Sequence, residues 1–260
     1  SMVFCNQSSK LSAVLFVFFM GYSVYLSGQE IVTDRPDQTE SSSTIPQNSL
    51  QIEMGILFSQ VDARTFESNI WNLPTTLLRY GITKNVELRL ANQFSSIVKS
   101  NEEETHHYGF SDLEFGTKIQ ILRKENINTE IAFLSHIVIP IGDNRISNAQ
   151  LGSISKLSIA HSITDKISLG YNLGYNYFGQ ERGIATYSLA LGFRLNNKWG
   201  FYIEPYGEWI NFETIASNLD GGFTYLLKKN IQLDISYGVG LNYHMHYSSV
   251  GFSWLIGAKN

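Results

Sequence analysis

Hydrophobic and polar residues alternate along most of the chain from residue 49 onward. The clearest case is Lys166–Phe178, KISLGYNLGYNYF, where Ile, Leu and Tyr take every second position and mostly Ser, Gly and Asn take the others. Because successive side chains of a β-strand point to opposite faces, this pattern predicts a strand with one apolar, aromatic face and one small, polar face. A soluble sandwich also alternates, but here the polar positions carry small residues and the pattern recurs to the end of the chain.

Twelve such strands are predicted, separated by turn and loop residues. Their approximate ranges are 49–60, 70–82, 86–98, 109–122, 129–139, 151–163, 166–178, 184–195, 199–210, 218–227, 231–241 and 249–256. The segment 129–139 is apolar on both faces, so its pattern is less clear than that of the others.

The predicted connections alternate in length. Tight turns built from Thr, Asn, Asp and Lys follow the even-numbered strands, whereas longer loops follow most odd-numbered strands, at 61–69, 99–108, 142–150 and 211–217. Short turns at one end, longer loops at the other and an even strand count are typical of a Gram-negative outer-membrane barrel. We therefore predict an all-β, transmembrane, antiparallel up-and-down β-barrel of about twelve strands, which leaves no open edge in lipid.

Entry of the chain from the periplasm would place the tight turns in the periplasm and the longer loops outside the cell. Trp71, Trp199, Tyr202 and Trp209 lie near strand ends and are expected to form aromatic girdles in contact with outer-membrane lipid. The aromatic pattern is imperfect, because Tyr202 and Tyr206 fall on the predicted lumen side.

Residues 1–28 have the features of a secretory signal peptide. Lys10 precedes the apolar run 11–26, and small residues follow it before a predicted cleavage at Gln29. The alternative is a membrane-anchoring helix, for which the run is short. Cys5, the one cysteine, lies before the run, so the mature chain would hold no cysteine and need no disulfide.

Residues 29–47 are polar, contain two prolines and show no apolar period, which predicts an irregular periplasmic N-terminal segment ahead of a barrel over 48–260. The composition agrees with an ordered all-β chain: 43% of residues are hydrophobic, 16% are charged, and Tyr (14) and Phe (16) are abundant. The net charge of −4 comes without a basic block, so we exclude a nucleic-acid partner. No cofactor is expected.

Two stretches resemble the opening of a known outer-membrane family. They are Thr33–Ser41, TDRPDQTES, and Leu50–Gly55, LQIEMG. The family is described as "putative MetA-pathway of phenol degradation", its members are often called transporters, and further similar stretches lie at 77–81, 86–89, 111–118 and 232–234. The resemblance covers essentially the whole mature chain. It implies a barrel in the cell outer membrane that moves small molecules, aromatic or hydrophobic ones among them.

Charged residues occupy the predicted lumen face of four consecutive strands. They are Glu53, Arg79, Glu87, Arg89, Asp112, Glu114 and Lys118. Opposite charges among them could pair across strands, giving either a charged constriction that selects solutes or a filler that closes a narrow barrel. The other wall carries Glu204, Glu208, Asp220 and Asp234 with Arg194 as its basic residue, and such an acidic wall favours cations or neutral solutes over anions.

The segment before the first strand carries Asp34, Arg35, Asp37 and Glu40. Arg35 can bind a carboxylate through both arms of its guanidinium, and the acids can meet basic residues of the wall. Pro36 lowers the entropy lost when the segment becomes ordered. We predict that the segment folds into the lumen from the periplasmic side and narrows or gates the pore; the alternative is a mobile tail.

Two other chemistries remain to be weighed. His106-His107 and the pair His244 and His246 fall in predicted extracellular loops, where they could hold a metal ion, although solvated loop histidines are the simpler interpretation. We expect no metal site.

An outer-membrane phospholipase is also a twelve-strand barrel with a Ser/His site. Here the direct Ser–His adjacencies are Ser135-His136 and His161-Ser162, and adjacent residues of a strand face opposite sides, so neither pair can cooperate within its strand. No Gly-x-Ser-x-Gly motif is present. A small-molecule channel or transporter is therefore the favoured function, ahead of a closed structural or partner-binding barrel and of a lipid-active enzyme. The sequence gives neither the oligomeric state nor a protein partner.

Overall fold

The computed structural model describes residues 31–63, 66–100, 104–124, 127–179 and 182–257. The predicted signal peptide, residues 1–28, lies outside the described residues. Thirteen strands form one sheet. They are β1 Leu50–Ala63, β2 Phe66–Gly81, β3 Val86–Ser100, β4 Glu104–Phe110, β5 Leu113–Leu122, β6 Thr129–Ile139, β7 Gly152–Ser162, β8 Ile167–Tyr177, β9 Ile184–Arg194, β10 Trp199–Ile210, β11 Thr214–Lys228, β12 Ile231–Gly240 and β13 His244–Ile256. No helix in these ranges is long and apolar enough to cross a membrane.

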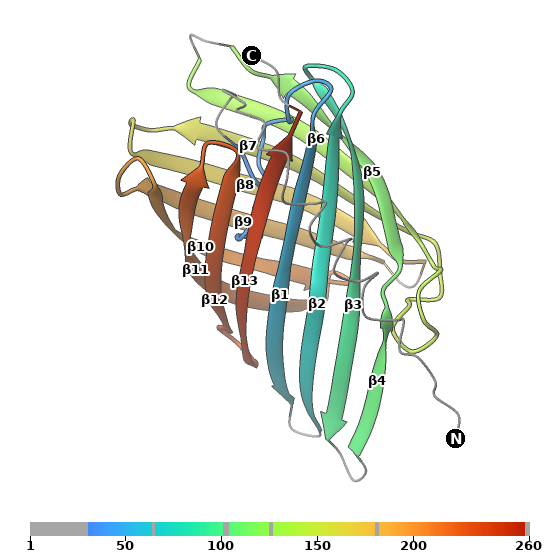
Figure 1. Cartoon of the computed structure of the whole chain (residues 1–260). Helices are drawn as coiled ribbons and strands as arrows, with labels where there is room; N and C mark the ends of the chain where they lie inside the picture. The colour runs from blue at the N-terminus through green and yellow to red at the C-terminus, as the bar shows by residue number, and fades with distance from the viewer. Residues whose placement is uncertain (1–30, 64–65, 101–103, 125–126, 180–181, 258–260) are drawn as a thin grey trace, which may run out of the picture.

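The sheet closes on itself into a barrel (Figure 1). Apart from β4 and β5, each strand pairs antiparallel with its neighbour in the chain, and β1 also pairs with β13 over Leu50–Asp62. The strand β3 pairs with β4 along its second half and with β5 along its first half. Together β4 and β5 therefore fill one place in the ring, which confirms a barrel of twelve strands with one extra segment.

The break between β4 and β5 corrects the predicted continuous strand 109–122. It lies at Ser111 and Asp112, whose side chains bond to backbone groups. The Ser111 hydroxyl accepts from the Gln93 backbone amide, and the Asp112 carboxylate accepts from the Gly142 and Asn148 backbone amides.

The predicted alternation of loop lengths is also wrong. The segments 61–69, 99–108 and 211–217 belong largely to strands, which extend beyond the predicted ends, and β1 to β4 project past the other strands in Figure 1. The connection 140–151 is the long one. Backbone pairing can continue where a strand leaves an apolar environment, whereas the alternation of hydrophobic and polar residues stops there. The alternation therefore marks the end of the apolar environment and not the end of the strand.

The barrel has an exposed apolar exterior and a buried polar interior. In β8, Leu173 is 57% exposed on the outside, whereas Asn172 is 2% exposed on the inside. The ambiguous segment 129–139 follows the same rule, since β6 turns Phe133 and Ile137 outward and Leu134 inward. Trp71, Trp199 and Trp209 are exposed on the outer face as expected for girdles, but Tyr202 is buried, which corrects its assignment to a girdle.

We call the end of the barrel that holds the connections after β2, β5, β7, β9 and β11 the turn end, and the opposite end the loop end. Residues 31–48, named here the lumen loop, begin and finish at the turn end. The Ile31 amide donates to the Lys229 carbonyl, and the Asn48 amide donates to the Gly81 carbonyl. Ile31 and Ile45 pack together with Leu255, so the lumen loop enters the barrel (Figure 1) and returns to the same end.

Candidate functional site

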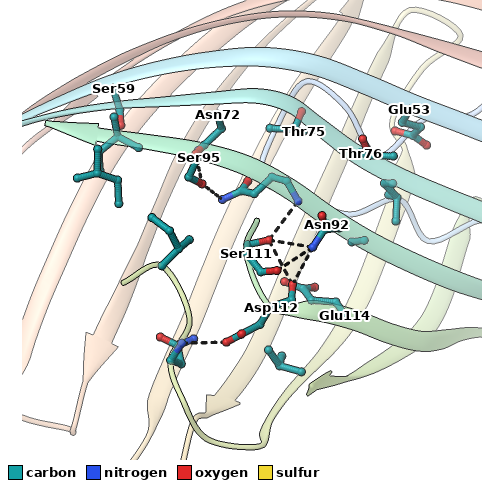
Figure 2. A pocket seen from close by; sticks show the side chains of 18 of the residues that line it. Glu53, Ser59, Asn72, Thr75, Thr76, Asn92, Ser95, Ser111, Asp112 and Glu114 are labelled. Carbon is teal, nitrogen blue, oxygen red and sulfur yellow. Dashed lines mark hydrogen bonds between the residues drawn. The ribbon is translucent and has the colours of Figure 1, made fainter. Parts of the chain in front are cut away.

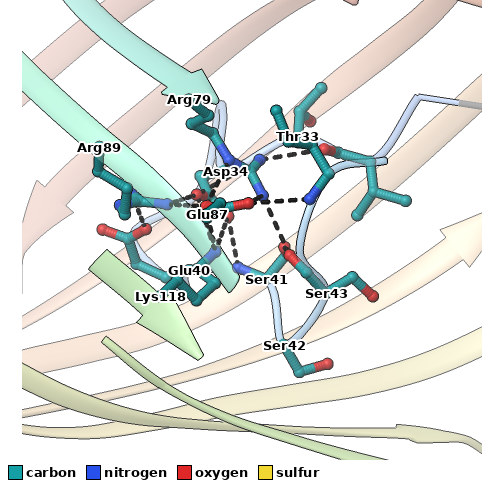
Figure 3. A network of polar contacts seen from close by, with 12 residues as sticks. Thr33, Asp34, Glu40, Ser41, Ser42, Ser43, Arg79, Glu87, Arg89 and Lys118 are labelled. Carbon is teal, nitrogen blue, oxygen red and sulfur yellow. Dashed lines mark hydrogen bonds and ion pairs between the residues drawn. The ribbon is translucent and has the colours of Figure 1, made fainter. Parts of the chain in front are cut away.

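The lumen loop is bound to the barrel wall by a buried ionic network (Figure 3). Asp34 is its centre: its carboxylate lies 2.6 Å from Arg89 Nη1, 3.0 Å from Lys118 Nζ and 3.4 Å from Arg79 Nη1. Burial alone would raise the pKa of Asp34, but the charges of Arg79, Lys118 and Arg89 outweigh burial and hold it well below its ordinary value. Asp34 is therefore an ionised carboxylate shared by three cations.

The wall supplies two more carboxylates to this network. Arg79 binds Glu87 through two nitrogens, at 2.9 and 3.0 Å, and its Nη1 lies 3.0 Å from Glu53 Oε1. Arg89 Nη1 lies 2.9 Å from Glu87 Oε1. Arg79, Glu87 and Lys118 are fully buried. Buried charges are tolerated only when they are paired and hydrogen-bonded, so this part of the wall depends on all of these contacts.

Sheet register explains why the wall needs Asp34. Arg79 stands directly opposite Arg89 across β2 and β3, and Glu87 stands opposite Lys118 across β3 and β5. Two like charges facing each other across a strand pair repel. Glu87 of the wall bonds to both arginines, but the cations Arg79, Arg89 and Lys118 outnumber the wall carboxylates by one. Asp34 supplies the remaining negative charge.

Glu40 carries the network across the lumen. Its carboxylate lies 2.5 Å from Arg89 Nη2 and 3.7 Å from Lys156 Nζ. Its backbone amide donates to Asn172 Oδ1 at 2.7 Å, and Asn172 Nδ2 donates back to its carbonyl at 3.1 Å. Glu40 thus links β3 to β7 and β8 through the lumen loop.

Arg35 is held against the part of the wall formed by β12, β13, β1 and β2. Its Nη2 lies 2.9 Å from Asp234 Oδ1 and donates to the Ser249 hydroxyl at 3.0 Å. The guanidinium crosses a row of residues that are in register on β12, β13, β1 and β2, namely Asp234, Gly251, Gly55 and Thr75. A Cβ atom at Gly251 or Gly55 would lie 2.4 or 2.5 Å from Arg35 Nη2. The guanidinium therefore occupies the space left by the missing side chains of these two glycines.

The third contact region of the lumen loop is acidic. Glu204 accepts hydrogen bonds from the Gln38 amide, at 2.7 Å, and from the Thr39 hydroxyl. It stands opposite Asp220, which accepts from the Tyr247 hydroxyl. Burial, followed by the nearby charges of Glu204 and Asp220, raises the pKa of Asp37 well above its ordinary value. Asp37 is therefore favoured in its protonated form, the reverse of Asp34.

Hydroxyl groups complete the attachment before the chain enters β1. Ser43 donates to Glu130 Oε2 at 2.6 Å, and the Ile45 amide donates to Glu87 Oε2 at 2.9 Å. Thr44 donates to the Lys84 carbonyl at 2.9 Å. The run of Ser and Thr residues at 41–44 thus binds side chains and backbone on the β2–β6 side of the barrel.

Two cavities lie beside the lumen loop. One, of about 560 Å³, is lined mainly by β1, β2, β3 and β5. It combines amide and hydroxyl side chains such as Asn72, Asn92 and Ser95 with apolar ones such as Leu77 and Ile97 (Figure 2). The other, of about 1040 Å³, includes turns between β7 and β10 at the turn end. Arg35 lines both cavities, so the lumen loop stands between them.

The structure places the other predicted lumen residues as follows. Asp112 does not join the ionic network; it holds the connection 140–151 by accepting from the Gly142 and Asn148 amides at 3.1 and 2.9 Å. Glu114 accepts a hydrogen bond from His136 Nδ1 at 2.9 Å, since His136 Nε2 accepts from Arg89. Glu208 is part-buried on the same wall as Glu204.

Arg194 lines the larger cavity, as its predicted lumen position requires, but it is not paired with the described acids of its wall. It is exposed at the turn end, and no ion pair joins it to an acid within the described ranges. The basic partner of Asp234 is Arg35, which comes from outside the wall.

Several contacts were missed from the sequence. Lys156 lies at an inward position of a predicted strand and could have been found from the alternation, whereas His136 was hidden in a strand that is apolar on both faces. His136 lies between Arg89, at 3.0 Å, and Glu114. Gln120 and Asn172, which bind the lumen loop, carry no charge and gave no signal of their own.

The histidines expected in loops lie in strands. His106 and His107 belong to β4, and His244 and His246 belong to β13, which corrects their predicted placement. Among the described residues, no group of three or more His, Cys, Asp or Glu side chains is arranged to hold a metal ion.

The adjacent Ser–His pairs also point apart. Ser135 bonds to Ser155, whereas His136 faces the lumen network. His161 bonds to Thr129 and stacks on Tyr171. Neither arrangement resembles an activated serine, in which the imidazole bonds to the nucleophilic hydroxyl.

Comparison with solved structures shows the same fold in outer-membrane channels. An outer membrane channel from Pseudomonas putida F1 superposes with a TM-score of 0.70 at 11% identity, covering 87% of this chain and 100% of that one. The KdgM porin gives a TM-score of 0.52 at 12% identity, covering 78% of this chain and 98% of that one. At these identities the likeness concerns the fold alone.

Sequence comparison gives the family. No curated protein matches the chain significantly. The model of one protein family matches residues 33–247, which span the lumen loop and the barrel from β1 into β13. The chain therefore belongs to the family described as "Putative MetA-pathway of phenol degradation".

Proposed function

We propose that the protein is an outer-membrane channel for small molecules and that the lumen loop controls the width of its pore. The observation that carries this proposal is the position of Arg35, which lines both lumen cavities. A solute passing between the two ends of the barrel has to move past the lumen loop. The channel fold of the neighbours and the family membership agree with this function.

The lining of the lumen indicates the class of solute. The cavity toward the loop end offers hydroxyl and amide groups beside aliphatic side chains, which suits a small molecule with an apolar body and a hydrogen-bonding group. The family description, which concerns phenol degradation, fits such a molecule.

A closed structural barrel is the second candidate, because the ionic network around Asp34 joins the lumen loop to the wall through fully buried charges. Such a network could hold the pore shut permanently. Conductance distinguishes the two functions.

The test uses single-channel recording in planar bilayers with a thiol reporter. Gln38→Cys places a thiol at an exposed position of the lumen loop, and Ser100→Cys places one at the loop end, outside the lumen. A bulky methanethiosulfonate reagent should lower the conductance of the first variant and leave that of the second unchanged. A folded wild-type barrel without measurable conductance would instead support the closed barrel.

A further inference from the structure

Basic residues gather at the turn end of the barrel. They are Lys84, Arg123, Lys124, Lys166, Lys198, Lys228 and Lys229, all exposed, and we call them the basic rim. They come from each of the five connections at this end. Among the described residues of these connections Asp165 is the one acid, and Arg123 has a partner in Glu130 at 3.5 Å. The basic rim therefore carries a surplus of positive charge around the whole barrel mouth.

The loop end has no such surplus. Its described charged residues mix both signs and include Asp62, Lys99, Asp143, Arg145, Arg182 and Glu213. Charge is thus sorted along the barrel axis, although the whole chain has a net charge of −4.

An exposed aliphatic residue also lies in each connection of the basic rim or at the end of the strand before it, one to three positions before the basic residue. These are Ile82, Ile121, Ile163, Leu195 and Leu227, with exposed fractions from 41% to 61%. By the alternation of their strands they continue the outward-facing apolar rows, so they mark the edge of the apolar exterior. The same pair, an aliphatic side chain followed by a cation, is repeated five times around the barrel.

Aromatic residues lie at the same level. Trp199 packs on Tyr225 with ring centroids 4.7 Å apart, and Lys198 Nζ lies 6.0 Å from the Tyr225 ring centroid. Trp and Tyr favour the headgroup region of a bilayer, where an apolar ring and a polar group are both accommodated. The basic rim is therefore placed where lipid headgroups would be.

We propose that the basic rim binds the phosphate groups of anionic glycerophospholipids, while the preceding aliphatic side chains lie in the edge of the acyl layer. Lys and Arg side chains can extend their charged ends toward a headgroup while their methylene chains cover apolar surface. Distribution over five separate connections fits a ring of lipids around the barrel better than one acidic protein, which would contact a single patch. This inference concerns the lipid contact and does not depend on transport.

The experiment measures lipid selectivity of the folded barrel in phosphatidylcholine vesicles. Quenching of tryptophan fluorescence by brominated phosphatidylglycerol, relative to brominated phosphatidylcholine, gives the relative association constant. One basic residue near an anionic surface contributes a factor of about five. We expect a severalfold preference of the wild-type barrel for phosphatidylglycerol that weakens as salt is added.

Two variants with equal charge loss provide the comparison. The rim variant combines Lys166→Gln, Lys198→Gln and Lys228→Gln; the control combines Lys99→Gln, Arg145→Gln and Arg182→Gln at the loop end. The rim variant should lose most of the preference and the control should keep it. Equal losses in the two variants, or no preference in the wild type, would overturn the proposal.

A third measurement distinguishes binding of lipid from binding of a soluble anion or of a protein partner. Soluble glycerophosphate at the concentration of the labelled headgroups should not displace the lipid, and Ile163→Asn with Leu195→Asn should weaken lipid association although no charge is lost. Full displacement by glycerophosphate would show that the basic rim is a site for soluble anions and not for lipid. An unchanged lipid association in the aliphatic variant would contradict the placement of these side chains in the acyl layer.

Discussion

Arg79 and Arg89 face each other directly across β2 and β3, and both form an ion pair with Asp34 of the lumen loop. Like charges facing each other across a strand pair repel. The wall sets two carboxylates, Glu53 and Glu87, beside three buried cations, so Asp34 supplies the negative charge that the wall lacks. The lumen loop is therefore part of the charge balance of the barrel and not only an occupant of its pore. Removal of the Asp34 carboxylate should therefore change the stability of the folded barrel more than it changes the passage of solutes.

Asp34→Asn should destabilise the folded barrel by about 3–5 kcal/mol, because it removes the ionised partner of buried cations. Asp37→Asn, three positions along the same loop, should change stability little near neutral pH or increase it, since Asp37 favours the protonated form that asparagine imitates. Urea-induced unfolding in lipid vesicles gives both values. Equal losses in the two variants would contradict the assigned charge states.

The two aspartates should respond to pH in opposite directions. The folded-state pKa of Asp34 is lowered, so its contribution is fully present above the ordinary value of 3.8 and is lost as pH falls from there through the folded-state pKa. The folded-state pKa of Asp37 is raised, so above pH 3.8 the folded barrel binds more protons than the unfolded chain does. The barrel therefore loses stability as pH rises from 3.8 through the folded-state pKa.

Unfolding measured between pH 3 and pH 8 tests this. The stability of the wild type relative to Asp37→Asn should fall as pH rises from about 4, whereas its stability relative to Asp34→Asn should fall as pH drops below about 4. Parallel pH curves for wild type and Asp37→Asn would mean that Asp37 titrates normally.

Gly251→Ala should displace the Arg35 guanidinium from its position over the two glycines, because the three atoms nearest to the added Cβ all belong to Arg35. The contact with Asp234 would be lost, and we expect the same rise in single-channel conductance as in Arg35→Gln. Gly192→Ala is the matched control, since its added Cβ meets the Ser168 side chain at 2.7 Å and not the lumen loop. A conductance change in the control of the same size would attribute the effect to the strand and not to Arg35.

Leu173→Arg should destabilise the barrel by about 2–4 kcal/mol if Leu173 lies near the bilayer midplane, because it puts a charge on the apolar exterior of β8. Asn176→Arg, three residues further on, is the control on the lumen side. Heat-modifiable migration in gels reports folded barrel for both variants. A folded, unaltered Leu173→Arg barrel would show that this face does not contact lipid.

The sequence by itself determined most of the strands, their faces and the type of barrel. Period-two alternation is a local property of a β-strand, so stretches such as Lys166–Phe178 show their inner and outer faces without any tertiary information. The same alternation separated buried charges such as Glu53 and Lys118 from the apolar exterior. The mixed charges of residues 34–40 also indicated a segment that could bind the wall.

Only the tertiary structure decided how these residues meet. Arg35 and Asp234 are 199 positions apart, and their contact requires the closure of β13 onto β1. The pairing of Arg79 with Arg89 requires the register of β2 and β3, and the division of 109–122 into two strands requires Asp112 to find backbone partners in another segment. The alternation of a strand shows whether a side chain points into the barrel or out of it. Which residues it meets there depends on the closure of the barrel and the register of its strands, and these depend on interactions around the whole ring.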